Sequence, residues 1–159
     1  MEIKVGFGFD VHRLEEGADL WLGGIKIPSP KGAIGHSDAD VLTHSICDAL
    51  LGAINLRDIG FHFPNTDPQY KGIESVKLLE EVCRLVTENG YVVNNIDTTI
   101  SLEEPKISPY IPAMKKALAV ASCITEEDIS IKATTTEKLG FTGRQEGVAA
   151  YAVVLVKKA

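Results

Sequence analysis

The stretch Val5-Gly6-Phe7-Gly8-Phe9-Asp10-Val11-His12 predicts a β-strand that ends in two side chains able to bind a metal ion. Side chains two positions apart in a strand share a face, so Asp10 and His12 point the same way. His44, 32 positions after His12, lies in a segment with helical spacing. One carboxylate and two imidazoles would leave one position of a tetrahedral site open for substrate or water.

A structural explanation of these three residues remains open at this point. Asp-x-His pairs with one distant His arise by chance, His12 suits a hydrogen-bonded surface position, and Asp10 suits the cap of a turn. The segments around them favour the metal site.

Periodicity along the chain predicts a single domain, residues 1–159, with the element order strands, helices, strand, helix, strands. Strands are expected up to His12, as a pair turning at Gly23-Gly24 within residues 19–27, and at residues 91–102, 129–135 and 147–157. Helices are expected from Ser37 or Asp38 to about Ala53 and at residues 73–89 and 109–122, with loops at residues 28–35 and 58–70. This order favours an α+β fold, a mixed β-sheet with helices packed on one face.

The composition narrows the class of partner. A net charge of −6 disfavours a nucleic-acid surface, so a phosphorylated ligand would depend on metal ions and backbone amides. The chain enters a strand pattern at once and has no apolar run of about 20 residues, so neither a signal peptide nor a membrane span is expected. Cys47, Cys83 and Cys123 are widely spaced and suit core positions in a reducing compartment, which indicates a cytoplasmic protein.

The segment Gly35-His36-Ser37-Asp38-Ala39-Asp40 leads into the predicted helix of His44. A helix start presents free N–H groups and partial positive charge, so it suits a phosphate, with His36 as a further donor. An ordinary capped helix with an incidental histidine explains the same residues. Asp48, one turn after His44, is expected either to orient the His44 imidazole or to face solvent.

The long loop Asp58-Ile59-Gly60-Phe61-His62-Phe63-Pro64-Asn65-Thr66-Asp67 is rich in turn-forming and charged residues. Such a loop is typical of functional sites, and a turn-rich connector is the alternative. His62 is a weaker candidate for a fourth metal ligand, because Phe61 and Phe63 indicate packing.

A third polar segment follows a predicted strand: Ala133-Thr134-Thr135-Thr136-Glu137-Lys138-Leu139-Gly140-Phe141-Thr142-Gly143-Arg144. Hydroxyl groups and turn amides hold phosphate oxygens, and the carboxylate of Glu137 suits a hard cation such as Mg²⁺. A capping box, Thr134-x-x-Glu137, at the start of a short helix is a compatible alternative. No Walker-type glycine-rich motif is present, which excludes an ATPase loop of that kind.

Together these segments resemble the 2-C-methyl-D-erythritol 2,4-cyclodiphosphate synthase family of the non-mevalonate isoprenoid pathway. The resemblance extends from Gly8 to the final strand. It is carried by Gly8-Phe9-Asp10-Val11-His12, His36-Ser37-Asp38-Ala39-Asp40, Asp58-Ile59-Gly60, Phe63-Pro64-Asn65-Thr66-Asp67 and the eleven residues from Thr134 to Arg144.

The resemblance implies a homotrimer with active sites between subunits, one Zn²⁺ per subunit and a second divalent ion, Mg²⁺ or Mn²⁺. It assigns Zn²⁺ to Asp10, His12 and His44. It assigns transition-state stabilisation to His36 and Thr135, and the second ion to Glu137. The implied substrate-binding residues are Ser37, then Asp58, Ile59, Gly60, Phe63, Pro64, Asn65, Thr66 and Asp67 at the methylerythritol phosphate, Leu102, Glu103, Glu104, Pro105, Lys106, Ile107, Ser108, Thr134 and Thr136 at the cytidine diphosphate, and Phe141 and Arg144 in the rest of the pocket.

The implied reaction makes physical sense of these residue types. In 4-diphosphocytidyl-2-C-methyl-D-erythritol 2-phosphate, the 2-phosphate attacks the β-phosphorus and CMP leaves. The nucleophile is already an anion, so metal ions and fixed donors, rather than a strong base, lower the barrier.

Two features depart from the family pattern. Asn65 stands where Asp is expected, and Glu103 and Glu104 add negative charge to the nucleotide segment, where they are expected to face solvent. Two other functions remain open at this point. One is a metal-dependent phosphohydrolase that uses the same site to activate water, and the other is a nucleotide-binding or trimeric scaffold protein with structural histidines.

Overall fold

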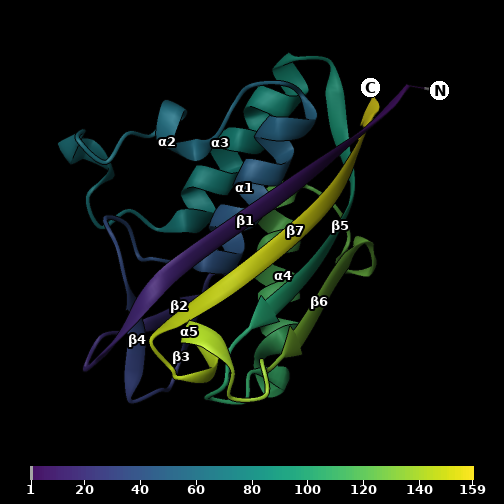
Figure 1. Cartoon of the computed structure of the whole chain (residues 1–159). Helices are drawn as coiled ribbons and strands as arrows, with labels where there is room; N and C mark the ends of the chain where they lie inside the picture. The colour runs from purple at the N-terminus through teal and green to yellow at the C-terminus, as the bar shows by residue number, and fades with distance from the viewer. Residues whose placement is uncertain (1) are drawn as a thin grey trace.

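A five-stranded mixed sheet organises the chain, of which the computed structural model describes residues 2–159. The strands lie in the order β4-β1-β7-β5-β6 (Figure 1). Only β5 and β6 pair in parallel, and the other neighbours are antiparallel. The strands are β1 Ile3–Glu16, β4 Lys31–Ile34, β5 Tyr91–Ser101, β6 Ile129–Thr134 and β7 Gly147–Lys158.

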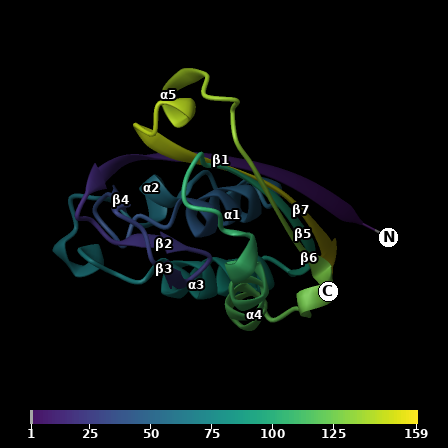
Figure 2. The ribbon, with the colours of Figure 1, turned by 90° about the horizontal axis from the view of Figure 1, so that it is seen from below.

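The three long helices lie together on one face of this sheet (Figure 2), which confirms the predicted α+β arrangement. They are α1 Val41–Ala53, α3 Ser75–Glu88 and α4 Ile111–Ser122. The core lies between them and the sheet, and it includes the fully buried Leu42, Ile46, Leu79 and Ile100. The remaining elements are the hairpin strands β2 Leu20–Leu22 and β3 Ile25–Ile27 and the short helices α2 Ile59–His62, η1 Pro68–Tyr70, η2 Ser108–Tyr110, η3 Glu126–Asp128 and α5 Gly140–Gly143.

Two glycines of β1 let α1 lie directly against the sheet. A Cβ atom at Gly8 would stand 1.8 Å from the carbonyl oxygen of Ser45, and one at Gly6 would stand 1.8 Å from that of Ala49. Both contacts are with helix backbone, so only residues without a side chain fit. The close approach brings His44, in the first turn of α1, next to the later part of β1.

The opposite face of β1 and β7 is apolar and exposed. Val5 and Phe7 are each 64% exposed, and the rings of Phe9 and Tyr151 stack with centroids 5.1 Å apart on this face. The exposed apolar side chains of the two strands are Ile3, Val5, Phe7, Phe9, Val11, Tyr151 and Val153. A contiguous apolar face of this kind marks an interaction surface.

Several predicted boundaries were wrong. Strand β1 continues past His12 to Glu16 because its last residues pair with β4, so the expected loop at residues 28–35 contains a strand. Helix α1 begins at Val41 rather than at Ser37 or Asp38, and the loop at residues 58–70 contains α2 and η1. The turn at Gly23-Gly24 is confirmed, with φ of 58° and 77°. None of the helices in residues 2–159 has the length and apolar character needed to cross a membrane.

Candidate active site

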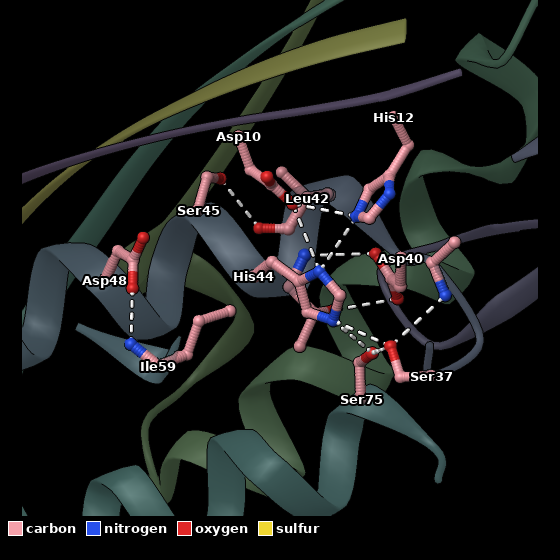
Figure 3. Close-up of polar contacts among 12 residues, drawn as sticks. Asp10, His12, Ser37, Asp40, Leu42, His44, Ser45, Asp48, Ile59 and Ser75 are labelled. Carbon is pink, nitrogen blue, oxygen red and sulfur yellow. Dashed lines mark hydrogen bonds and ion pairs between the residues drawn. The ribbon is translucent and has the colours of Figure 1, made fainter. Parts of the chain in front are cut away.

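Asp10 and His12 extend from β1 toward α1, where His44 meets them (Figure 3). Oδ2 of Asp10 lies 3.0 Å from Nε2 of His12 and 3.1 Å from Nδ1 of His44. The two nitrogen atoms are 3.1 Å apart. Ligand atoms about 2.0–2.1 Å from a tetrahedral ion stand roughly 3.3 Å from one another, so this triangle has nearly the dimensions of a zinc site.

The outer ring nitrogens of both histidines have partners within the protein. Nδ1 of His12 lies 3.1 Å from the carbonyl oxygen of Ile34, to which it donates. Nε2 of His44 lies 2.8 Å from Oγ of Ser75 and 3.1 Å from Oγ of Ser37. Partners at the outer nitrogens orient the rings with their inner nitrogens toward Asp10, as is usual for metal-binding histidines.

The charges in the cluster also suit a cation. Burial by itself would raise the pKa of Asp10, but the contacts with His12 and His44 outweigh it and lower that pKa to about 2. Burial would lower the pKa of His12, but Asp10 and the carbonyl of Ile34 outweigh it and raise that pKa above its ordinary value of 6.5. The carboxylate is therefore ionised at neutral pH, and protons compete with a metal ion for Nε2 of His12.

The carboxylate of Asp40, fully buried at the N-cap of α1, fixes the start of the helix that carries His44. It accepts hydrogen bonds from the backbone N–H groups of Gly23 at 2.9 Å and Gly24 at 2.7 Å. It also accepts from the N–H of Thr43 at 3.0 Å and the hydroxyl of Thr43 at 2.8 Å. The β2–β3 hairpin and α1 are thus held together one turn away from His44.

A pocket of about 380 Å³ opens beside the Asp10–His12–His44 cluster, which is within the range of small-molecule sites. His36 is in its wall, with Nε2 3.4 Å from the carbonyl oxygen of Asp67. The lining residues are Asp10, His12, Gly35, His36, Ser37, His44, Ile59, Gly60, Phe63, Asn65, Tyr70, Ile73 and Leu78. The metal-ligand cluster therefore faces a space where a ligand fits.

The sequence matches the model of the YgbB family over residues 3–157. The chain belongs to this family. It is 62% identical over 158 residues to the 2-C-methyl-D-erythritol 2,4-cyclodiphosphate synthase of Parabacteroides distasonis, a match that covers 99% of this chain and 98% of that protein. It is 61% identical to the synthase of Cytophaga hutchinsonii over 158 residues, which is 99% of each chain.

Solved structures of the family have the same fold. A 2C-methyl-D-erythritol-2,4-cyclodiphosphate synthase in its CDP-bound form matches with a TM-score of 0.90 at 40% identity, covering 97% of this chain and 100% of that one. The bifunctional IspDF from Campylobacter jejuni matches with a TM-score of 0.95 at 43% identity. That match covers 99% of this chain and 43% of the bifunctional chain.

The loop that the family resemblance assigns to the methylerythritol phosphate lies only partly in the pocket. Ile59, Gly60, Phe63 and Asn65 line the pocket, together with His36 and Ser37 from the segment before α1. Asp58 instead accepts from the N–H of Phe61 at 2.9 Å and caps α2. Asp67 accepts from the N–H of Gln69 at 3.0 Å and caps η1, while Pro64 and Thr66 are outside the lining.

The two segments assigned to the nucleotide and the second ion lie together, away from this pocket. The N–H of Leu102 donates to the carbonyl oxygen of Thr134 at 3.0 Å. Between residues 102 and 144, no residue lines the pocket beside the cluster. Figure 2 shows α5 on the opposite side of β1 and β7 from α1. Within one chain, the two halves of the site predicted from the resemblance therefore do not meet.

Glu103 does not face solvent as expected. Its carboxylate accepts from the N–H groups of Thr136 at 3.0 Å and Lys138 at 3.1 Å, so it shapes the turn after β6, whereas Glu104 is exposed. The alternative of a Thr134-x-x-Glu137 capping box was wrong. Glu137 and Lys138 have φ of 54° and 62°, a left-handed backbone that cannot begin a helix.

Asp48 was wrongly predicted to orient His44 or to face solvent. It accepts from the N–H of Ile59 at 2.8 Å and so anchors α2 at the pocket wall (Figure 3), and burial raises its pKa. His62 donates from Nε2 to the carbonyl oxygen of Leu56 at 2.7 Å, which agrees with packing rather than metal binding. Sequence reasoning missed Ser75, the hydrogen-bond partner of His44 that lies 31 positions away. The only hint of it in the sequence is that a serine stands near the start of a predicted helix.

Proposed function

We propose that this protein is a 2-C-methyl-D-erythritol 2,4-cyclodiphosphate synthase, a lyase that converts 4-diphosphocytidyl-2-C-methyl-D-erythritol 2-phosphate to the cyclic diphosphate and CMP. The observation that carries the proposal is the Asp10–His12–His44 cluster, whose ligand atoms lie within 4.8 Å of one another at the edge of a pocket. The chain is about 60% identical to 2-C-methyl-D-erythritol 2,4-cyclodiphosphate synthases, and this similarity supports the assignment of the cluster to this reaction.

Asp10, His12 and His44 would hold Zn²⁺, which supplies charge stabilisation to phosphate oxygens when bound. An oxygen of the 2-phosphate attacks the β-phosphorus, the bond from that phosphorus to the bridging oxygen breaks, and CMP leaves with the bridging oxygen. His36, in the pocket wall, would donate to the phosphate under attack. Ser37, Ile59, Gly60, Phe63 and Asn65 would place the methylerythritol phosphate, with Asp58, Pro64, Thr66 and Asp67 shaping the loop.

The cytidine diphosphate would bind in a neighbouring copy of the chain, so we propose a homotrimer with shared sites. Two observations support this arrangement: α5 and the Asp10–His12–His44 cluster lie on opposite sides of β1 and β7, and the apolar face of those strands is exposed in a single chain. The residues proposed for the nucleotide are Leu102, Glu103, Glu104, Pro105, Lys106, Ile107, Ser108, Thr134 and Thr136, with Phe141 and Arg144 beside them.

Thr135 and Glu137 complete the proposed site in that neighbouring segment. Glu137 is exposed and its backbone is held in a left-handed turn, so its carboxylate is available to a second divalent ion, Mg²⁺ or Mn²⁺, on the diphosphate. Thr135 would stabilise the transition state with its hydroxyl. We propose the cytoplasm as the compartment, in keeping with the free thiols of Cys47, Cys83 and Cys123.

The test uses the purified protein, the cytidine diphosphate substrate and product analysis by ³¹P NMR. The proposal predicts CMP and a cyclic diphosphate, whereas a phosphohydrolase with the same site releases inorganic phosphate. His44→Ala should abolish stoichiometric zinc, measured by elemental analysis, and leave a folded trimer. Full zinc occupancy in that variant would exclude the assigned ligands.

A further inference from the structure

A fully buried serine connects the metal-ligand cluster to a second carboxylate. Ser75 is the first residue of α3, and its Oγ lies 2.8 Å from Nε2 of His44 (Figure 3). The same hydroxyl contacts Oδ1 of Asp38. Asp38 is otherwise committed to backbone groups, since it accepts from the N–H of Ser75 at 2.9 Å and from that of Asp40 at 3.1 Å.

The direction of these hydrogen bonds follows from the donor inventory. A carboxylate only accepts, so the hydroxyl hydrogen of Ser75 is directed at Asp38. The oxygen of Ser75 is then free only as an acceptor toward His44. The Ser75 oxygen therefore favours the tautomer of His44 with the hydrogen on Nε2, in which Nδ1 keeps its lone pair for a metal ion and, without one, accepts from Nε2 of His12 at 3.1 Å.

We propose that Ser75, fixed by Asp38, is the positioning residue that sets the tautomer and the ring orientation of His44 for metal binding. The proposal rests on the metal site proposed above. It also gives the start of α3 and the segment before α1 a common function, because the same hydrogen bonds hold both against His44. Removing an outer partner of a metal-binding histidine typically weakens metal binding about 10–100-fold.

Ser37 contributes less to this arrangement. Its Oγ lies 3.1 Å from Nε2 of His44, longer than the Ser75 contact, and it accepts from the N–H of Ala39 at 3.3 Å. Among residues 2–159, no carboxylate contacts the Ser37 hydroxyl and fixes its direction. We therefore expect Ser37 to support the histidine only when Ser75 is in place.

Zinc affinity, measured by competition with a chelating indicator on the purified protein, tests the proposal. Ser75→Ala should weaken zinc binding about 10–100-fold. Asp38→Asn should weaken zinc binding as well, because the amide nitrogen would place N–H groups opposite the donors whose hydrogen bonds the carboxylate accepts. Ser45→Ala is the matched control. Ser45, like Ser75, is fully buried, and it follows His44 in α1, but its hydroxyl donates to the carbonyl of Leu42 at 2.8 Å (Figure 3). The Ser45→Ala protein should therefore bind zinc like the wild type.

A spectroscopic measurement separates positioning from general destabilisation. In ¹⁵N NMR of the metal-free wild-type protein, the neutral His44 ring should carry its hydrogen on Nε2 rather than on Nδ1, and this measurement does not depend on whether the variants fold. A hydrogen on Nδ1, or unchanged zinc affinity in folded Ser75→Ala, overturns the role of Ser75 while the metal site stands. Failure of the wild-type protein to bind stoichiometric zinc overturns the metal site and this proposal together.

Discussion

Replacing Gly8 by alanine tests whether the close contact between β1 and α1 creates the metal site. The new Cβ would stand 1.8 Å from the carbonyl oxygen of Ser45, where an ordinary contact begins at 3.4 Å. Neither backbone can rotate away as a side chain would, so α1 must move from β1 by about 1.6 Å. His44 precedes Ser45 in the chain, so it moves as well.

The size of the effect follows from two quantities. A rigid shift of this size would increase the 3.1 Å separation of Nδ1 of His44 and Oδ2 of Asp10 by up to about 1.6 Å, to roughly 4.7 Å, whereas metal–ligand distances vary by only about 0.2 Å. Overpacking a core contact typically costs about 1–3 kcal/mol of unfolding free energy, which lowers Tm by roughly 2–12 °C in a protein of this size.

The assay is zinc per chain by elemental analysis, together with Tm by calorimetry in the metal-free state. Gly8→Ala should contain zinc well below one ion per chain and have a lower Tm. Gly52→Ala is the control in the same helix, because no atom lies within 4 Å of its added Cβ. Alanine is the better helix former, so that control should gain about 0.5–1 kcal/mol and keep its zinc. A Gly8→Ala protein with wild-type Tm and full zinc would show that the contact between β1 and α1 does not create the metal site.

Four further predictions concern the proposed site. Because the pKa of His12 is raised above 6.5, protons compete with zinc for this side chain. The zinc affinity should therefore fall about tenfold per pH unit below that pKa, and a zinc affinity that stays constant from pH 5.5 to 8 would contradict this. Glu137→Gln should raise the Mg²⁺ concentration needed for activity and retain zinc, and an unchanged Mg²⁺ titration would remove that role. Mixing inactive His12→Ala and Thr135→Ala proteins should restore part of the activity, because hybrid trimers would contain some intact shared sites. If the subunits exchange and the rate nevertheless stays at zero, the sites are not shared. His36→Ala should keep its zinc and lose about 10²–10³-fold in kcat with a smaller change in KM, and normal turnover would leave His36 a plain loop residue.

The sequence predicted the parts of the fold and site that depend on local periodicity. The alternation of β1 puts Asp10 and His12 on one face, and the spacing of α1 places His44 near them. The two-glycine turn follows from the residues that adopt positive φ. Each of these features requires only neighbours within a few positions.

Features set by contacts between distant segments were not predictable from pattern. Helix α1 starts late because the Asp40 carboxylate accepts hydrogen bonds from the N–H groups of Gly23 and Gly24, in a hairpin 17 and 16 residues earlier in the chain. Strand β4 exists because it pairs with the end of β1, although its sequence is typical of a loop. Ser75 replaces Asp48 as the partner of His44 because α3 packs beside α1, an arrangement that no spacing within either helix encodes.

Mass spectrometry of the products formed in H₂¹⁸O distinguishes intramolecular cyclisation from hydrolysis. Intramolecular attack of the 2-phosphate on the β-phosphorus uses no water, so we expect CMP and a cyclic diphosphate that both lack ¹⁸O. A hydrolase acting through Asp10, His12 and His44 would place one solvent oxygen in a phosphate product. Incorporation of ¹⁸O during turnover by the zinc-loaded protein would contradict cyclisation and indicate hydrolysis.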